Sequence, residues 1–134
     1  MMAISAQNTT IHVAIATWEM STYFDKRKKF NGIKLKTSKW IRPPSNTAPT
    51  QAKAAGLYMI CTLSKHIAEK KGFDDSLMLD SNGYVAESTG ANIFFVKNNK
   101  LYTPIADCFL NGITRPVSYT HLRAHETEAD LVCR

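Results

Sequence analysis

The feature that most constrains the fold is a single long helical pattern, which runs from about Ala52 to Lys71. Its apolar and small side chains recur at helical spacing and share one face, namely Leu57, Ile60, Cys61, Ser64, Ile67 and Ala68. Gly72 follows a basic last turn, which is a typical place for a helix to stop. Because strand patterns lie on both sides, we expect a mixed α/β domain with sheets around one long helix.

Short strand patterns account for much of the remaining chain. Residues 11–17 are β-branched and apolar and predict a buried strand. Residues 31–40 alternate in polarity and predict a half-buried strand with Ile33, Leu35 and Thr37 on its apolar face. Two hairpins are predicted further along, at 76–80 with 84–88 and at 92–97 with 100–103, the second turning at Asn98 and Asn99. Residues 42–50 hold three prolines and predict a loop, and we expect the sheet pairings to run beyond this chain.

Composition narrows the class of protein. The 134 residues are 44% hydrophobic, which suits one globular domain, and no apolar run approaches the roughly 18 residues of a membrane helix. Three cysteines without framework spacing and the lack of a signal-peptide pattern predict a cytoplasmic protein with reduced thiols. The formal charge is +6, but its one dense basic run, residues 26–29, favours a solvated face over a nucleic-acid patch.

Three side chains and one turn have the chemistry of a ligand site, although each has an ordinary alternative. Lys53 has small neighbours, and an apolar setting would free its amine as a nucleophile, whereas a lysine near a helix start is commonly a surface residue. Tyr58 is either a phenol donor to a ligand or a packed helix residue. Glu87 is either a surface charge at a strand end or a partner for a cationic ring nitrogen. Residues 109–115 form a glycine-containing turn whose N–H groups can bind phosphate.

Taken together, these segments resemble one family. Residues 87–115 are similar throughout to the signature of the class IV pyridoxal-phosphate aminotransferases, with Glu87, Asn92-Ile93-Phe94, Leu101-Tyr102-Thr103 and Leu110-Asn111-Gly112-Ile113-Thr114-Arg115 at the expected spacing. Residues 45–59 resemble the segment that holds this family's Schiff-base lysine. Residues 18–24 and 38–44 look most like the branched-chain amino-acid aminotransferases. Two positions depart from the family pattern, since Met20 replaces a frequent aromatic and Ala91 a frequent acidic residue.

The resemblance implies a fold, a cofactor and a set of site residues. The fold is the D-amino-acid aminotransferase-like fold type IV, of which residues 1–115 would form part of the large, cofactor-binding domain. The cofactor is pyridoxal 5'-phosphate, for which Lys53 would form the Schiff base and act as the catalytic base, while Glu87 would pair with the pyridine nitrogen. The remaining implied roles belong to Tyr58 at the phenolic oxygen, Ile113 and Thr114 at the phosphate, Leu110 on the ring and Tyr23 on the substrate side.

The expected reaction is the transfer of the amino group of leucine, isoleucine or valine to 2-oxoglutarate, a transamination that belongs to branched-chain amino-acid biosynthesis. The partners would be small amino acids and 2-oxo acids, and the intact protein is expected to form a homo-oligomer. A D-amino-acid aminotransferase or aminodeoxychorismate lyase is the alternative within the family, and a non-catalytic basic binding module is the alternative outside it. Because the resemblance covers only the first half of the large domain, we expect the isolated chain to be unstable and inactive.

The last segment, residues 116–134, does not resemble an aminotransferase. It carries side chains of metal-ligand type, namely His121, His125, Glu126 and Cys133. However, residues 117–127 match the translation of a transposase-type sequencing adapter, and Pro116 would disturb the helix that the family has at this point. We therefore predict that residues 116–134 are a non-native tail without a metal site.

Overall fold

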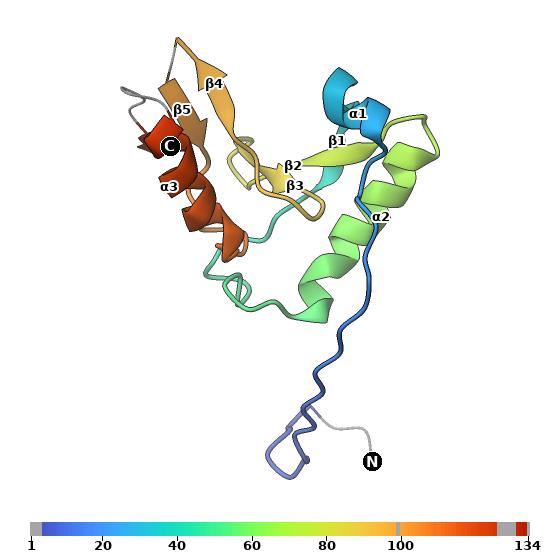
Figure 1. Ribbon diagram of the computed structural model, residues 1–134. Coiled ribbons are helices and arrows are strands. Elements are labelled where there is room, and N and C mark those ends of the chain that lie inside the picture. Colours follow the sequence, from blue (N-terminus) through green and yellow to red (C-terminus); the bar gives the residue numbers. More distant parts are fainter. Residues whose placement is uncertain (1–3, 99, 126–130, 134) are drawn as a thin grey trace.

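A helix packed on a small mixed sheet forms the centre of the protein. The computed structural model describes residues 4–98, 100–125 and 131–133. Helix α2 (Met59–Glu69), preceded by the 3-10 turn η1 (Ala55–Tyr58), contacts a sheet of β1 (Leu35–Ile41), β2 (Asp75–Leu79) and β3 (Val85–Ser88) (Figure 1). Strands β1 and β2 are parallel, whereas β2 and β3 are antiparallel. The predicted mixed α/β fold is thereby confirmed.

A second sheet contains the other hairpin. It consists of β4 (Phe95–Lys97), β5 (Lys100–Thr103) and β6 (Leu131–Cys133), with β4 antiparallel and β6 parallel to β5. Two further helices are α1 (Lys26–Asn31) and α3 (Thr114–His125). Both predicted hairpins are confirmed, and Asn98 adopts the positive φ of 51° that the turn requires.

The face of α2 that the sequence predicted is the face that packs. Cys61, Ser64 and Ala68 are buried on it, against β1 and β2. The Ser64 hydroxyl shares a 2.7 Å hydrogen bond with the Ser38 hydroxyl of β1, which joins the helix to the edge strand. Beyond the helix, Gly72 has a φ of +77°, a backbone conformation that residues with a Cβ atom rarely adopt.

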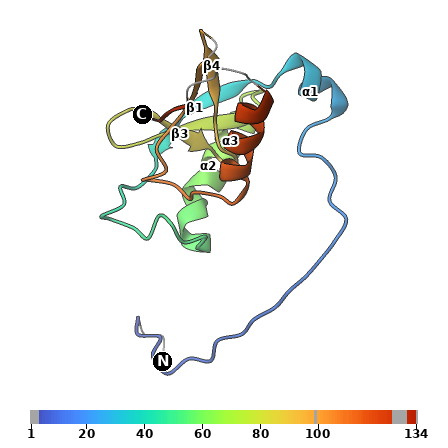
Figure 2. The same cartoon turned by 60° about the vertical axis from the view of Figure 1, so that its left-hand side comes forward.

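The first predicted strand is wrong in this structure. Residues 11–17 have no regular structure, and Ile11, Val13 and Ile15 are 87%, 84% and 93% exposed. Figures 1 and 2 show the N-terminal segment running away from the folded body. An isolated β-branched segment becomes a strand only when another strand pairs with it, and neither sheet pairs with residues 11–17.

The strand predicted over residues 31–40 is confirmed as β1, but its facing is the reverse of the prediction. Lys36 and Ser38 are half-buried, whereas Leu35 and Thr37 are exposed. A strand presents alternate residues to alternate faces, so the packing of Ser38 on α2 places Leu35 and Thr37 on the other face.

Helix α3 contradicts the expectation for Pro116. This proline is the third residue of the helix, where the backbone N–H groups have no intrahelical acceptor. A proline in the first turn therefore removes no helical hydrogen bond and leaves the helix intact.

The basic run of residues 26–29 lies on α1, and its side chains are exposed, as predicted. The Asp25 carboxylate caps this helix by accepting the Lys28 N–H at 2.8 Å, and the Lys28 ammonium forms an ion pair with Asp74. Within the described ranges, none of the helices has the length and apolar character needed to cross a membrane.

Candidate active site

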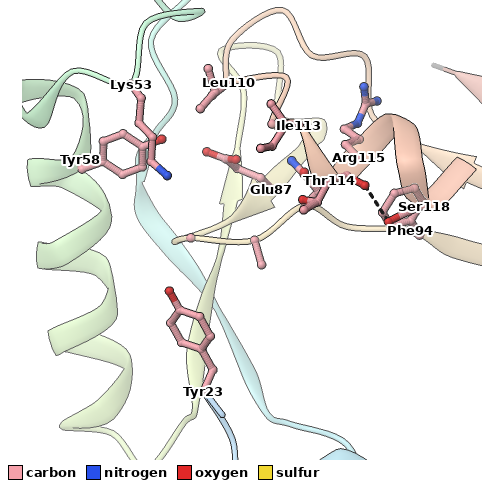
Figure 3. Close-up of a pocket in the computed structure, with 14 residues that line it drawn as sticks. Tyr23, Lys53, Tyr58, Glu87, Phe94, Leu110, Ile113, Thr114, Arg115 and Ser118 are labelled. Atoms are coloured by element: carbon pink, nitrogen blue, oxygen red, sulfur yellow. Dashed lines mark hydrogen bonds between the residues drawn. The ribbon is translucent and has the colours of Figure 1, made fainter. Parts of the chain in front are cut away.

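A cavity of about 740 Å³ brings together every site residue predicted from the sequence. Its lining includes Tyr23, Lys53, Tyr58, Glu87, Leu110, Ile113 and Thr114. These residues come from the N-terminal segment, the entry to α2, strand β3 and the turn before α3 (Figure 3). Gly90, Ala91, Asn92, Phe94, Arg115 and Ser118 also line it.

Lys53 lies at one side of the cavity, two residues before η1 begins. Lys53 and Tyr58 both line the cavity, and in Figure 3 both side chains point into it on the side across from Leu110 and Ile113. Lys53 and the small residues on either side of it are exposed. Of the two positions considered for Lys53 from the sequence, the structure therefore shows the exposed one, at the open side of the cavity.

Glu87 is the buried charge of the site. It lies in β3 opposite Met78 of β2 and is only 7% exposed. Burial raises the pKa of the Glu87 carboxyl to about 7, and the neighbouring Arg42 guanidinium acts against that rise. The carboxyl is thus poised between its neutral and charged forms near neutral pH, and a cationic ligand in the cavity would favour the charged form.

Arg42 holds this carboxyl in place, although it is not among the site residues predicted from the sequence. The residue follows β1, is 1% exposed, and has its Nε 3.3 Å from Glu87 Oε1. Its guanidinium also donates to Leu57 O at 3.1 Å, Cys61 Sγ at 3.2 Å and Cys108 O at 3.3 Å. A buried arginine needs such partners, but only the three-dimensional structure shows which residues supply them.

Tyr58 lines the same side of the cavity as Lys53. It ends η1, and its ring centroid is 5.9 Å from the Arg42 guanidinium carbon. Partial burial raises the pKa of the Tyr58 phenol, Glu87 adds to the rise, and Arg42 opposes it. The phenol therefore keeps its proton and can donate a hydrogen bond into the cavity.

The opposite side of the cavity is a turn that starts a helix. Gly112 N–H donates to Leu110 O at 2.9 Å, and Arg115 N–H donates to Gly112 O at 3.0 Å, just before and within α3. Ile113 is 90% exposed and Thr114 is exposed. First-turn N–H groups and the positive end of a helix dipole attract anions, so this turn suits a phosphate.

The donor set fits pyridoxal phosphate. A primary amine can react with its aldehyde, a buried carboxyl can pair with its ring nitrogen, a phenol can bind its phenolic oxygen, and the helix start can bind its phosphate. Among the residues whose side chains the structure describes, no group of three or more histidine, cysteine or acidic side chains could hold a metal ion. Three of the tail's candidate ligands, His125, Glu126 and Cys133, lie outside the residues whose side chains the structure describes.

Comparison with known proteins supports the same family. A model of the amino-transferase class IV family matches residues 3–131. The branched-chain-amino-acid aminotransferase of Pseudomonas aeruginosa is 39% identical over 124 residues, which cover 92% of this chain and 40% of that protein. The chain thus spans about 40% of the length of this relative.

Solved structures agree with the sequence match. The crystal structure of an aminotransferase from Brucella abortus bound to PLP superposes with a TM-score of 0.71 at 32% identity, over 85% of this chain and 39% of that chain. The branched-chain amino acid aminotransferase from Escherichia coli gives a TM-score of 0.70 at 36% identity, over 78% of this chain and 35% of that chain. The predicted aminotransferase fold is confirmed, and the chain belongs to the class IV aminotransferases.

Proposed function

We propose that the full-length protein containing this chain is a branched-chain amino-acid transaminase that uses pyridoxal 5'-phosphate. The observation that carries the proposal is the meeting of Lys53, Tyr58 and Glu87 with the turn at residues 110–114 around one cavity. The substrate class follows the relatives, which are named branched-chain aminotransferases. The reaction transfers the amino group of leucine, isoleucine or valine to a 2-oxo acid, for which we propose 2-oxoglutarate.

Lys53 has two tasks in this proposal. Its Nζ would hold the cofactor through the aldehyde group, and its amine, when free, would serve as the base that moves the proton at the substrate Cα. When bound, pyridoxal phosphate supplies an electron sink for the pair released at the substrate Cα. Lys53 is exposed and lines the cavity, so its amine is accessible to a ligand there.

Glu87 keeps the cofactor's ring nitrogen protonated. Burial raises the pKa of the Glu87 carboxyl to about 7, and a protonated ring nitrogen beside it would favour the carboxylate form, which in turn would stabilise the protonated nitrogen. Tyr58 donates to the phenolic oxygen, and the N–H groups of Ile113 and Thr114 bind the phosphate. Leu110 packs on the ring, and Tyr23 lies on the substrate side.

The lysine assignment is tested by borohydride reduction of the full-length protein with pyridoxal phosphate, which fixes the cofactor to the lysine that holds it. Peptide mass spectrometry should find the label on Lys53, and the Lys53→Ala variant should remain unlabelled and inactive. The Lys70→Ala variant is the matched control, since Lys70 is exposed at the end of α2 and does not line the cavity. Label on another lysine, with Lys53 spared, would show the assignment to be wrong.

The substrate assignment is tested by comparing kcat/KM for the three branched-chain amino acids with that for D-alanine, each with 2-oxoglutarate. A higher value for the branched-chain substrates supports the proposal. A preference for D-alanine, or release of pyruvate from aminodeoxychorismate, would instead support the two alternatives within the family.

Further proposals concern the chain's extent and setting. We propose that residues 1–115 form part of the large domain, that residues 116–134 are not native, and that the intact protein is a cytoplasmic homo-oligomer. The family match extends to residue 131, so the tail is tested by resequencing the gene beyond the Arg115 codon. If the resequenced gene encodes an aminotransferase sequence after Arg115, and not the present residues 116–134, this tail is of foreign origin. If the gene encodes residues 116–134, the tail is native and this proposal is wrong. A cooperative unfolding transition with transaminase activity in the isolated 134-residue chain would contradict its predicted instability.

A further inference from the structure

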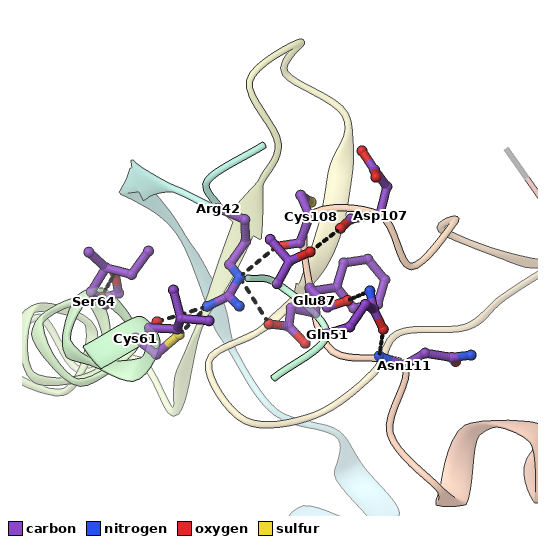
Figure 4. A network of polar contacts seen from close by, with 12 residues as sticks. Arg42, Gln51, Cys61, Ser64, Glu87, Asp107, Cys108 and Asn111 are labelled. Atoms are coloured by element: carbon purple, nitrogen blue, oxygen red, sulfur yellow. Dashed lines mark hydrogen bonds and ion pairs between the residues drawn. The ribbon is translucent and has the colours of Figure 1, made fainter. Parts of the chain in front are cut away.

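The loop at residues 106–111 follows β5 and leads into the turn at residues 110–114, which would bind the phosphate and is called the phosphate turn below. Side chains from the segment before Lys53 hold this loop. Its carbonyl oxygens at Ala106 and Phe109 accept from Gln51 Nε2 at 2.9 and 3.0 Å, that of Asp107 accepts from Thr50 Oγ1 at 2.7 Å, and that of Cys108 accepts from Arg42 Nε at 3.3 Å. Gln51 Oε1 also accepts the Asn111 N–H at 3.2 Å (Figure 4). Four consecutive carbonyls thus depend on side chains from residues 42–51.

These bonds compensate for the absence of regular structure in the loop. Residues 106–111 belong to no helix or strand, although Cys108 and Phe109 are buried. Carbonyl groups in such a position need partners, because an unpaired polar group is costly away from water. Gln51 supplies three of the bonds with one planar amide, and an asparagine would be one methylene too short to reach the same groups.

We propose that Gln51 is a positioning residue that sets the distance between the two protein segments that would bind the two ends of the cofactor. This inference rests on the proposed function. Gln51 is two residues before Lys53, which would bind the aldehyde end. Its amide binds Phe109 O and Asn111 N–H, the groups on either side of Leu110, where the phosphate turn begins. One side chain therefore connects the lysine segment directly to the turn that would bind the phosphate.

The test compares pyridoxal phosphate with pyridoxal, which lacks the phosphate, in the full-length apoprotein. Gln51→Met keeps the side-chain length and removes all three hydrogen bonds. Because Gln51 is itself an exposed residue, its replacement leaves the buried side chains of the core unchanged and the variant should fold. We expect its Kd for pyridoxal phosphate to rise about tenfold and its Kd for pyridoxal to change less than about twofold. Gln7→Met is the matched control, since Gln7 is exposed in the N-terminal segment.

A second measurement needs no cofactor. Hydrogen exchange in the apoprotein should become faster at the amides of residues 110–114 in Gln51→Met and stay unchanged in Gln7→Met. Unchanged affinity and exchange, or an equal loss of affinity for both ligands, would overturn the inference while leaving the proposed function standing. If the wild-type protein binds neither ligand, the proposed function fails, and the exchange measurement alone decides whether Gln51 holds the turn.

Discussion

Replacement of Glu87 by glutamine should remove a defined part of the pH dependence of stability. The carboxyl is 7% exposed, and its burial raises its pKa from an ordinary 4.5 to about 7 against the opposing charge of Arg42. The glutamine side chain has nearly the same size and does not titrate. The substitution therefore isolates the cost of ionising this one carboxyl inside the fold.

The sign and the size follow from the two pKa values. Between pH 4.5 and 7, the folded protein holds a proton on Glu87 that the unfolded chain has lost, so the free energy of unfolding falls as the pH rises. Each pH unit in this window corresponds to about 1.36 kcal/mol, so Glu87 alone lowers the stability by about 3 kcal/mol across it. Outside the window its contribution does not change with pH.

The assay is urea unfolding of the full-length apoprotein at pH 4.5 and pH 8, followed by tryptophan fluorescence. Relative to wild type, Glu87→Gln should gain about 3 kcal/mol of unfolding free energy between the lower and the higher pH. Glu69→Gln is the matched control, because Glu69 is an exposed carboxylate on α2. If Glu87→Gln follows the wild-type pH dependence to within about 1 kcal/mol, burial does not raise this pKa and the argument is refuted.

Three further substitutions test the supporting structure. Arg42→Met should lower the free energy of unfolding by about 3–5 kcal/mol at pH 8, because it leaves a buried carboxylate without its cation, and a loss below about 1 kcal/mol in urea unfolding would contradict this. Gly72→Ala should cost about 1 kcal/mol because of its φ of +77°, whereas Gly56→Ala, which has open space and no positive φ, should cost less in the same assay. Asp74→Asn should weaken the ion pair that holds α1 at Lys28, so trypsin should cut the basic run faster, and an unchanged cleavage rate would show that α1 does not depend on it.

The sequence was sufficient to predict the elements that depend on interactions between residues close together in the chain. The periodicity of α2, the positive φ of Gly72 shortly after its end and the hairpin turn at Asn98 all depend on residues a few positions apart, and all three are present. The helix predicted from about Ala52, however, begins only at Met59, after η1. The site residues were found through the resemblance to a family, and the structure places them around one cavity. Their chemical roles remain proposals until the lysine and cofactor experiments are done.

Signals that depend on distant partners were misread or absent. Residues 11–17 have the composition of a buried strand, but composition does not provide the strand that must pair with them. The facing of β1 depends on the contact between Ser38 and Ser64, which lie 26 positions apart. Arg42 and Gln51 were missed because each acts on backbone or carboxyl groups at least 15 positions away. Only the fold reveals such pairings.

The loop at residues 106–111 also has a consequence for how this site tolerates mutation. Its carbonyl acceptors belong to the main chain, so they remain in place whichever side chains stand at Ala106 or Asp107. The donors at Thr50 and Gln51 are side chains, and a substitution there removes the bonds themselves. Substitutions should therefore be tolerated at Ala106 and Asp107 but not at Thr50 and Gln51. A saturation mutagenesis library of the two segments would show this difference directly.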